Sequence, residues 1–341
     1  MKASTDTMHF PLPALICDVG GTNIRVARLD QPGAALIPVG HAGTQGAPGL
    51  AEAIAAMAGA APARSMIVCA AGPLHGRSVK LTNADWSLDG PAVAEALGLE
   101  QGLLLQDFEA LALSIPSFDA DRLRVIGPPF GPPLGQPAGP RLILGPGTGL
   151  GAAALITVEG RYLAIASEAG HVEFGPAGEG EVAFWPYLDP VCGRITSESI
   201  LSGDGLSRLH RARLHAAGSS VKAADQAAIV AGALADPAGP ESDSVRLFWR
   251  LTARFAGDLA LIYMATGGVT LAGGILPRIS PLIDDKDFRA AFEAKAPMEQ
   301  LMRAMPTSLL TQPQAVLAGM AVIATDPGRF LIDYAARSWR R

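Results

Sequence analysis

Two short glycine-rich segments, far apart in the chain, have residue types suited to binding phosphate. They are Asp18-Val-Gly-Gly-Thr-Asn23 and Gly145-Pro-Gly-Thr-Gly-Leu-Gly151, and each lies between two apolar runs that are typical of strands. A hairpin turn without bulky side chains lets backbone N–H groups approach a phosphate closely, so that these groups become its ligands. Two such hairpins facing each other can hold the phosphates of one nucleotide from both sides. The pattern therefore predicts a nucleotide site made from two glycine turns.

The residues after each turn distinguish these segments from the common nucleotide motifs. In a Walker loop or a dinucleotide-binding fingerprint, the glycines open a helix. Here each turn leads into a second apolar run, Ile24–Val26 or Ala152–Ile156, and no G-x-x-x-x-G-K-[ST] occurs in the chain. The expected unit is a strand, a glycine turn and a second strand, and it occurs twice.

Around the first turn, apolar periodicity predicts three strands followed by alternating helices and strands. The expected strands are Ala14–Val19, Ile24–Asp30, Ala35–Pro38, Ser65–Ala70 and Gly102–Gln106, and the expected helices are Gly49–Ala60, Pro91–Leu97 and Glu109–Ser114. Asp107 directly follows the last of these strands, so we expect it at the strand's carboxyl end.

The same plan restarts after segment 127–140, in which proline and glycine exclude a helix or a central strand. The expected strands are Leu142–Leu144, Ala152–Ile156, Arg161–Ala166 and Val269–Ala272, and the expected helices are Glu198–Ala216, Ala223–Leu234, Asp243–Tyr263 and Ala315–Thr325. The repetition indicates an internal duplication. Two such α/β units facing each other leave a cleft at the carboxyl ends of their strands, where α/β sheets bind ligands.

Composition restricts the class of protein and its partners. A chain of 341 residues, 49% of them hydrophobic, suggests two domains, because single cores stop growing near about 250–300 residues. The formal net charge of −5 and the lack of a clustered basic face argue against nucleic acid. We find neither a signal-peptide pattern in residues 1–13 nor an apolar stretch of about 18 residues, so no membrane partner is expected.

The cysteines indicate neither a zinc site nor a disulfide framework. Cys17, Cys69 and Cys192 are widely separated and form no C-x-x-C pair. Because Cys17 and Cys69 lie inside apolar runs, we interpret them as small buried hydrophobic residues. This usage fits the reducing cytoplasm.

Taken together, the glycine segments resemble the nucleotide signatures of the superfamily that contains sugar kinases, actin and the heat-shock chaperone ATPases. Asp18–Asn23 is similar to its phosphate-1 signature, Gly147–Gly151 to its phosphate-2 signature and Leu271–Ile275 to its adenosine signature. Within the superfamily, the chain resembles the bacterial ATP-dependent glucokinases. Four further stretches carry this resemblance in the expected order: Leu81–Asn83, Gln106–Phe108, Glu168–Phe174 and Ser197–Gly203.

One observation narrows the branch, and the resemblance then implies a fold. The repressor and kinase group of the superfamily carries a cysteine-rich zinc site after a similar Gly-His pair, whereas only Cys192 follows His171 here. This favours the zinc-free glucokinase branch. The implied fold is α/β, with two ribonuclease-H-like, actin-type ATPase domains and an active-site cleft between them. We expect a smaller domain over 1–116 plus about 315–341, and a larger one over 117–314.

The resemblance makes Asp107 the general base, which accepts the proton of the sugar's primary hydroxyl as that oxygen attacks the γ-phosphate. From spacing alone, Asp107 fits equally a residue that caps the following helix. Gln106 stands where the branch usually has Asn. Either amide can hydrogen-bond a sugar hydroxyl, but Gln is longer by one methylene.

Other polar residues are implied as ligands of the sugar. These are Glu168, His171 and Glu198, with Asn83 as a weaker candidate. Carboxylates accept directed bonds from hydroxyl groups, which suits a hexose. Taken alone, His171 also fits a structural histidine, Glu198 a solvated acid at a helix start, and Asn83 a turn residue.

The resemblance assigns the glycine segments to ATP and its metal. Asp18 is the expected Mg²⁺ residue, acting through a water molecule, although it also fits an Asx-turn. The expected nucleotide contacts are Gly20, Gly21, Thr22, Asn23, Gly147, Thr148, Gly149, Gly273 and Gly274. Arg25 and the tail Arg337–Arg341 are interpreted as surface charge.

The implied activity is the ATP-dependent phosphorylation of D-glucose to glucose 6-phosphate, the first step of sugar catabolism, by a cytoplasmic homodimer. Gln106 keeps open a kinase for another or several hexoses, such as mannose or fructose. The alternative from a different class is a non-catalytic sugar sensor on the same fold. A repressor of that kind needs a DNA-binding helix-turn-helix, and only residues 1–13 precede the first expected strand.

Overall fold

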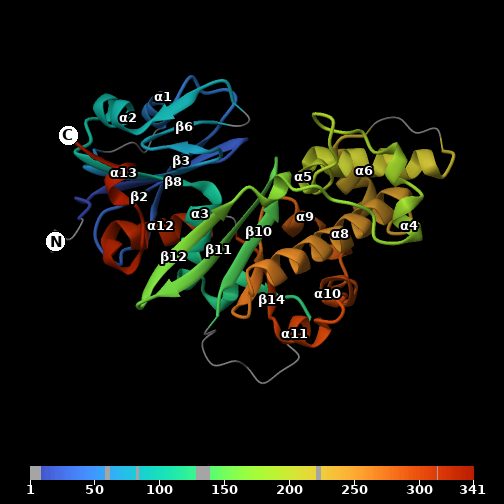
Figure 1. Cartoon of the computed structure of the whole chain (residues 1–341). Helices are drawn as coiled ribbons and strands as arrows, with labels where there is room; N and C mark the ends of the chain where they lie inside the picture. Colours follow the sequence, from blue (N-terminus) through green and yellow to red (C-terminus); the bar gives the residue numbers. More distant parts are fainter. Residues whose placement is uncertain (1–8, 58–61, 82–83, 128–138, 220–223, 313) are drawn as a thin grey trace. The chain divides into compact units, whose positions relative to one another are not determined.

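The structure is a computed structural model that describes residues 9–341 except 58–61, 82–83, 128–138, 220–223 and 313. The chain divides into two compact units (Figure 1). The first comprises Met1–Asp119, Leu155–Ala166 and Gln314–Arg341, and the second comprises Ala120–Ala154 and Ser167–Pro313.

A six-stranded mixed sheet forms the centre of the first unit. Its order is β15-β8-β4-β1-β2-β3, in which β1, β2 and β3 form an antiparallel meander, β4 and β8 run parallel to β1, and β15 closes the edge antiparallel to β8. The bounds are β1 (Ala14–Val19), β2 (Asn23–Leu29), β3 (Ile37–Gly43), β4 (Ser65–Ala70), β8 (Gln101–Gln106) and β15 (Ser338–Arg340). Every residue of β1 and β4 is buried, as expected for apolar strands that are covered on both faces.

Helices and a small three-stranded sheet complete the first unit. The helices are α1 (Leu50–Ala55), α2 (Gly90–Leu97), α3 (Asp107–Ser114), α12 (Ala315–Thr325) and α13 (Tyr334–Arg337), and the small sheet has the strands β5 (Leu74–His75), β6 (Ser78–Lys80) and β7 (Ser87–Asp89).

Helix α3 is held by close packing against α12. A Cβ atom at Gly319 would lie 2.5 Å from the Cα atom of Ser114, so only glycine permits this approach. The Ser114 hydroxyl donates to the carbonyl of Val316 across the same contact, at 3.3 Å. The contact fixes the helix whose first residue is Asp107.

The second six-stranded sheet has the order β12-β11-β10-β13-β14-β9. Its strands are β9 (Leu123–Val125), β10 (Arg141–Pro146), β11 (Leu150–Val158), β12 (Arg161–Ser167), β13 (Gly268–Leu271) and β14 (Thr307–Leu310). Strands β10, β13 and β14 run parallel, and β9 closes the edge antiparallel to β14. Three consecutive strands followed by parallel strands therefore occur in both sheets, which confirms the predicted α/β fold.

The remaining helices belong to the second unit, where the long helix α8 carries much of the core. They are α4 (Glu179–Val182), α5 (Ser197–Ile200), α6 (Gly203–Ala216), α7 (Gln226–Ala235), α8 (Pro240–Ile262), α9 (Leu276–Ile279), α10 (Asp285–Glu293) and α11 (Glu299–Ala304). Helix α8 packs against α6, α7 and α10. It buries Phe248, Trp249 and Phe255, and its course through the second unit can be followed in Figure 1. No described helix is long and apolar enough to cross a membrane.

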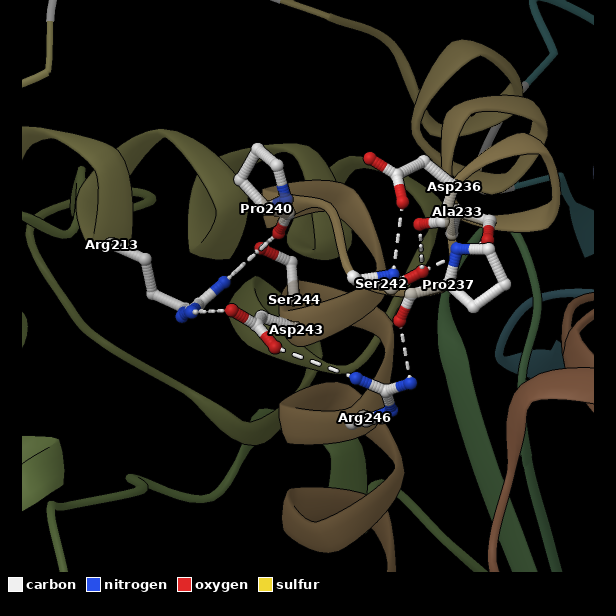
Figure 2. A network of polar contacts seen from close by, with 10 residues as sticks. Arg213, Ala233, Asp236, Pro237, Pro240, Ser242, Asp243, Ser244 and Arg246 are labelled. Atoms are coloured by element: carbon white, nitrogen blue, oxygen red, sulfur yellow. Dashed lines mark hydrogen bonds and ion pairs between the residues drawn. The ribbon is translucent and has the colours of Figure 1, made fainter.

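Polar contacts fix the start of α8 to its neighbours (Figure 2). The Ser242 hydroxyl lies 2.8 Å from the carbonyls of Ala233 and Asp236 at the end of α7. Arg213 of α6 donates to the Ser244 hydroxyl at 2.6 Å and forms an ion pair with Asp243 at 3.5 Å. These bonds satisfy polar groups that the packing of three helices removes from water.

The prediction of one continuous helix over Glu198–Ala216 was wrong, because the chain turns between α5 and α6. Ser202 caps α6 by accepting the backbone N–H of Gly205 at 3.0 Å. A Cβ atom at Gly205 would lie 2.4 Å from the Ile200 carbonyl carbon, so the second helix starts in close contact with the end of the first.

Three sequence expectations differ from the structure or lie partly outside it. The third strand is β3 at Ile37–Gly43 rather than Ala35–Pro38. Helix α1 ends at Ala55, and the predicted helix extended into residues 58–61, outside the described residues. Most of the proline-rich segment 127–140 also lies outside them.

His210 of α6 is a buried imidazole facing α8. Its Nδ1 atom lies 2.8 Å from the Ser244 hydroxyl, and its Nε2 atom lies 4.0 Å from a carboxylate oxygen of Glu241. Burial lowers the pKa of His210 below its model-peptide value of 6.5; Glu241 opposes this shift and Arg213 adds to it. The folded protein therefore favours neutral His210.

We expect the free energy of unfolding to decrease as the pH falls through about 6.5 toward the lowered pKa of folded His210. Over this range the unfolded chain binds a proton that the folded chain does not, so the slope of stability against pH is positive. Urea unfolding between about pH 7.5 and 5 measures this slope. His210→Gln should flatten it, whereas His215→Gln, at an exposed position on the same helix, should retain it. Equal slopes in the wild type and His210→Gln would contradict the assignment.

Candidate active site

The first glycine turn is a closed hairpin at the carboxyl end of β1. The Gly20 N–H donates to the Asn23 carbonyl at 2.9 Å. Thr44 braces the turn from outside, since its hydroxyl donates to the Gly20 carbonyl at 2.8 Å and its N–H to the Thr22 carbonyl at 2.9 Å. The residues Gly20, Gly21, Thr22 and Asn23 are thus held in a compact, braced turn.

Asp18 enters this turn as a buried carboxylate with a charged partner. The hairpin register places Arg25 opposite Asp18, and its guanidinium donates to Asp18 Oδ2 at 2.9 Å. Burial raises the pKa of Asp18, while Arg25 and the Cys69 thiol act in the opposite direction. Arg25 is therefore a partner of Asp18, and its interpretation as mere surface charge was wrong.

Parallel pairing brings Asp18 and Asp107 to one edge of the first sheet. Cys69 of β4 pairs with Asp18 on one side and with Leu105 of β8 on the other. Two strand spacings separate β1 from β8, which amounts to about 10 Å. Burial is the main cause that raises the pKa of the Cys69 thiol, and the charges of Asp18 and Asp107 raise it further. Both carboxylates are therefore close enough to influence the same buried thiol.

Asp107 is the first residue of α3, and Gln106 rather than Asp107 caps the helix. The side-chain carbonyl of Gln106 accepts the Glu109 N–H at 2.8 Å, and the Glu109 carboxylate accepts the Gln106 N–H at 3.3 Å. Oδ1 of Asp107 accepts the Phe108 N–H at 2.8 Å and a hydrogen bond from the Gln106 amide. Local bonds thus orient the Asp107 carboxylate at the end of β8.

Three segments of the second unit meet at Leu150, the residue after the second glycine turn. The Leu150 N–H donates to the Glu198 carboxylate at 2.8 Å. A Cβ atom at Gly170 would lie 2.2 Å from the Leu150 carbonyl oxygen, so the turn between Glu168 and His171 approaches the same residue. The second glycine turn and the three expected sugar ligands, Glu168, His171 and Glu198, therefore belong to segments that meet at the backbone of Leu150.

Glu168 and His171 are the exposed members of this cluster. Glu168 precedes the 3-10 turn η3 (Ala169–His171) and His171 is its last residue. The His171 N–H donates to the Glu168 carbonyl at 2.9 Å. Their side chains are 68% and 56% exposed, with 3.8 Å between a Glu168 carboxylate oxygen and His171 Nε2. This exposure leaves both side chains accessible to a polar ligand.

The second glycine turn is closed and anchored to α6. The Gly147 N–H donates to the Gly149 carbonyl at 2.7 Å, and the Gly203 N–H donates to the Gly147 carbonyl at 2.9 Å. A Cβ atom at Gly149 would lie 2.5 Å from a Glu198 carboxylate oxygen. A larger residue at Gly149 would therefore displace the Glu198 carboxylate from its bond to Leu150. Thr148 lies at the tip of this turn.

The third glycine segment lies beside the second turn. Gly273 has φ of +92°, and a Cβ atom there would lie 2.2 Å from the Pro146 carbonyl oxygen. Nothing would meet a Cβ atom at Gly274 within 4 Å, so its backbone borders open space. The ends of β10 and β13 therefore bring Gly273 next to Pro146, at the start of the second glycine turn, and Gly274 follows it in the chain. Asn83 lies outside the described residues.

The sequence interpretation missed several supporting residues. Thr44 had no recognisable signal, since it lies in a loop far from the turn that it braces. Arg25 had one, because a tight hairpin at Gly20-Gly21 fixes the register that pairs it with Asp18. Arg337, interpreted as surface charge, forms an ion pair with Glu109, whose side chain is only 8% exposed.

The residues around Asp18 fit a Mg²⁺ ion whose ligands are mainly phosphate oxygens and water molecules. Among the described residues, no group of three His, Cys, Asp or Glu side chains could hold a metal ion by itself. Mg²⁺ commonly uses one or two carboxylates together with substrate phosphates and retains several waters. Asp18 supplies one such carboxylate beside a turn with backbone donors, so the residues present suit that mode.

Comparisons with known proteins give a consistent result over nearly the whole chain. A family model described as Glucokinase matches residues 15–327. The chain is 40% identical over 338 residues to the glucokinase of Rhizobium meliloti strain 1021, covering 97% of this chain and 98% of that protein. It is also 36% identical over 343 residues to the glucokinase of Agrobacterium fabrum strain C58, and this match covers both chains completely.

Solved structures share the fold. The glucokinase from an Antarctic psychrotroph superposes with a TM-score of 0.77 at 26% identity, covering 92% of this chain and 98% of that one. A ROK family glucokinase from Streptomyces griseus, solved in complex with glucose and AMPPNP, superposes with a TM-score of 0.63 at 21% identity. That match covers 91% of this chain and 98% of the other, and it shows the fold alone.

Proposed function

The chain belongs to the glucokinase family of kinases, and we propose that it transfers the γ-phosphoryl group of ATP to D-glucose. The products are ADP and glucose 6-phosphate. The observation that carries this proposal is the convergence on Leu150, where a glycine turn suited to phosphate and a polar set suited to a sugar share one backbone position. A related glucokinase of the same fold has been solved with glucose and AMPPNP, which supports the pairing of these two ligands.

In this proposal Asp107 is the general base. Its carboxylate accepts the proton of the primary hydroxyl of glucose while the hydroxyl oxygen attacks the γ-phosphorus and the bond to the β-phosphate oxygen breaks. The location of Asp107 at the end of a parallel strand, with Oδ1 already fixed by two donors, supports this role. A base held in one orientation avoids the entropy of finding the productive geometry in each turnover.

The sugar is bound by Glu168, His171 and Glu198, and we retain Asn83 as a further expected contact. Carboxylates and an imidazole can each make directed bonds to hydroxyl groups. Once the bound sugar covers these side chains, a site of this kind rejects analogues that lack the matching hydroxyl by about 10⁴-fold or more, because the covered groups are left unpaired. The specificity for glucose therefore follows from directed bonds rather than from shape alone.

The nucleotide is bound by backbone groups of both glycine turns and of Gly273 and Gly274. When bound, Mg²⁺ neutralises charge on the transferring phosphates. Asp18 would hold it through a water molecule, and Arg25 keeps the buried Asp18 carboxylate paired. A homodimer and a cytoplasmic location remain predictions that come from the resemblance.

The first test measures ADP release with Mg-ATP and a panel of hexoses that includes glucose, mannose and fructose. We expect strong turnover of glucose and weak turnover of the other sugars, because their hydroxyl patterns leave directed groups unpaired. Preference for another hexose would keep the phosphoryl transfer and overturn the assigned sugar. ATP binding without turnover of any sugar would overturn the enzymatic assignment in favour of a sugar sensor.

The second test replaces the base. Asp107→Asn removes the proton acceptor and keeps the size of the side chain, so we expect kcat to fall by about 10²–10⁴-fold. The dissociation constant of glucose, measured by calorimetry without nucleotide, should stay close to that of the wild type. A kcat within about tenfold of the wild type would show that another group takes the proton.

The third test uses the contact between Glu198 and Leu150. Glu198→Gln replaces a charged acceptor by a neutral one, and a charged acceptor makes the stronger hydrogen bond. The change therefore weakens the expected bond to the sugar and also the bond from the Leu150 N–H that fixes the second glycine turn. We expect the KM values for glucose and ATP to rise together, each by about tenfold. Glu168→Gln is the matched control, because the Glu168 side chain is exposed and faces His171, and it should raise only the KM for glucose. Equal effects of both variants on the KM for ATP would contradict this division.

A further inference from the structure

The side chain of Gln106 is used within the protein at both ends of its amide. The carbonyl oxygen accepts the Glu109 N–H at 2.8 Å and so caps helix α3. The amide nitrogen donates to Oδ1 of Asp107. A sugar hydroxyl that bound to this amide would have to use its second N–H or the second lone pair of its oxygen, in the orientation that the two protein bonds already fix.

The length of glutamine matters for this double use. Residues preferred at the first cap position, such as Ser, Thr, Asn and Asp, have short side chains that reach the backbone N–H groups of the first turn. Gln106 makes the same cap bond, and its longer side chain also brings the amide nitrogen to the carboxylate of Asp107. One side chain therefore connects the start of α3 to the residue that carries the proposed chemistry.

A second layer holds this arrangement in place. The Glu109 carboxylate accepts the Gln106 N–H at 3.3 Å and completes the reciprocal cap. Arg337 of α13 forms an ion pair with the same carboxylate, whose side chain is 8% exposed. Because Glu109 is paired and buried, its position and that of Gln106 are fixed together.

We propose that Gln106 is a positioning residue that orients Asp107 for proton abstraction, rather than a ligand of the sugar. The proposal rests on the role of Asp107 as the general base. Two donors, the Gln106 amide and the Phe108 N–H, fix Oδ1 and therefore the plane of the carboxylate. A displacement of about 1 Å at a reacting group can lower a rate by about 10²-fold, so loss of one of the two donors has a measurable effect.

Gln106→Ser separates orientation from capping. Serine is a favourable cap residue but is too short to reach Asp107 while it caps, so the helix keeps its start and Asp107 loses a donor. We expect kcat to fall by about tenfold. The dissociation constant of glucose, measured by calorimetry without nucleotide, should stay within about twofold of the wild type, and Tm should be unchanged. Gln106→Ala removes both bonds, so it should lower kcat equally and also lower Tm by roughly 2–4 °C.

Asp89→Ala is the matched control for the loss of a cap in the same unit. Asp89 caps α2 by accepting the Ala92 N–H at 2.9 Å. This variant should lower Tm as Gln106→Ala does and leave kcat unchanged. A comparable loss of kcat in Asp89→Ala would show that capping alone explains the effect and would overturn the proposal.

The remaining outcomes are equally decisive. A glucose dissociation constant raised by about tenfold or more in Gln106→Ser would identify a sugar contact and overturn the positioning role. An unchanged kcat in Gln106→Ser, with Asp107→Asn inactive, would also overturn it and leave the assigned base intact. If Asp107→Asn kept its activity, the proposed function of Asp107 would fail instead.

Discussion

The carboxyl ends of parallel strands meet at one edge of a sheet, and the candidate chemistry of both units depends on this constraint. In the first sheet, pairing of β1, β4 and β8 brings Asp18 and Asp107 to the same edge from positions 89 residues apart in the sequence. In the second, pairing of β10 with β13 brings Gly273 next to the turn at Gly147. A residue at such a strand end lies close to the other residues of the site without a long loop, so the sheet holds its backbone in a fixed position.

Close backbone approach is the second requirement, and it explains why glycine is needed at particular positions. A side chain at Gly149 would collide with the Glu198 carboxylate, and one at Gly170 with the Leu150 carbonyl. These contacts bring Glu198 and the turn between Glu168 and His171 next to the second glycine turn without intervening atoms. The glycines of this unit therefore shape the polar cluster as well as leaving backbone donors accessible.

The strands and helices could be predicted from the sequence where apolar periodicity was strong, as in β1 and β4, whose bounds were predicted correctly. Edge strands such as β9 and β15, each of three residues, gave no periodic signal. The partners that depend on tertiary contacts were also missed. Arg337 lies 228 residues from Glu109, and no local pattern connects them. Candidate residues could thus be located from motifs, whereas the bonds that orient them required the structure.

Local capping and site geometry are coupled at the start of α3. Asp107 occupies the first helical position and Glu109 the third, where the helix N-terminus stabilises negative charge. Backbone N–H groups that a helix leaves unsatisfied at its start become fixed donors here, one to the Asp107 carboxylate and one to the side-chain carbonyl of Gln106. Phe108 N–H bonds Asp107, and Glu109 N–H bonds Gln106, so the helix start and the carboxylate orientation form one hydrogen-bonded unit. A substitution in this hydrogen-bonded helix start therefore changes the orientation of the Asp107 carboxylate even when the replaced residue makes no contact with a substrate.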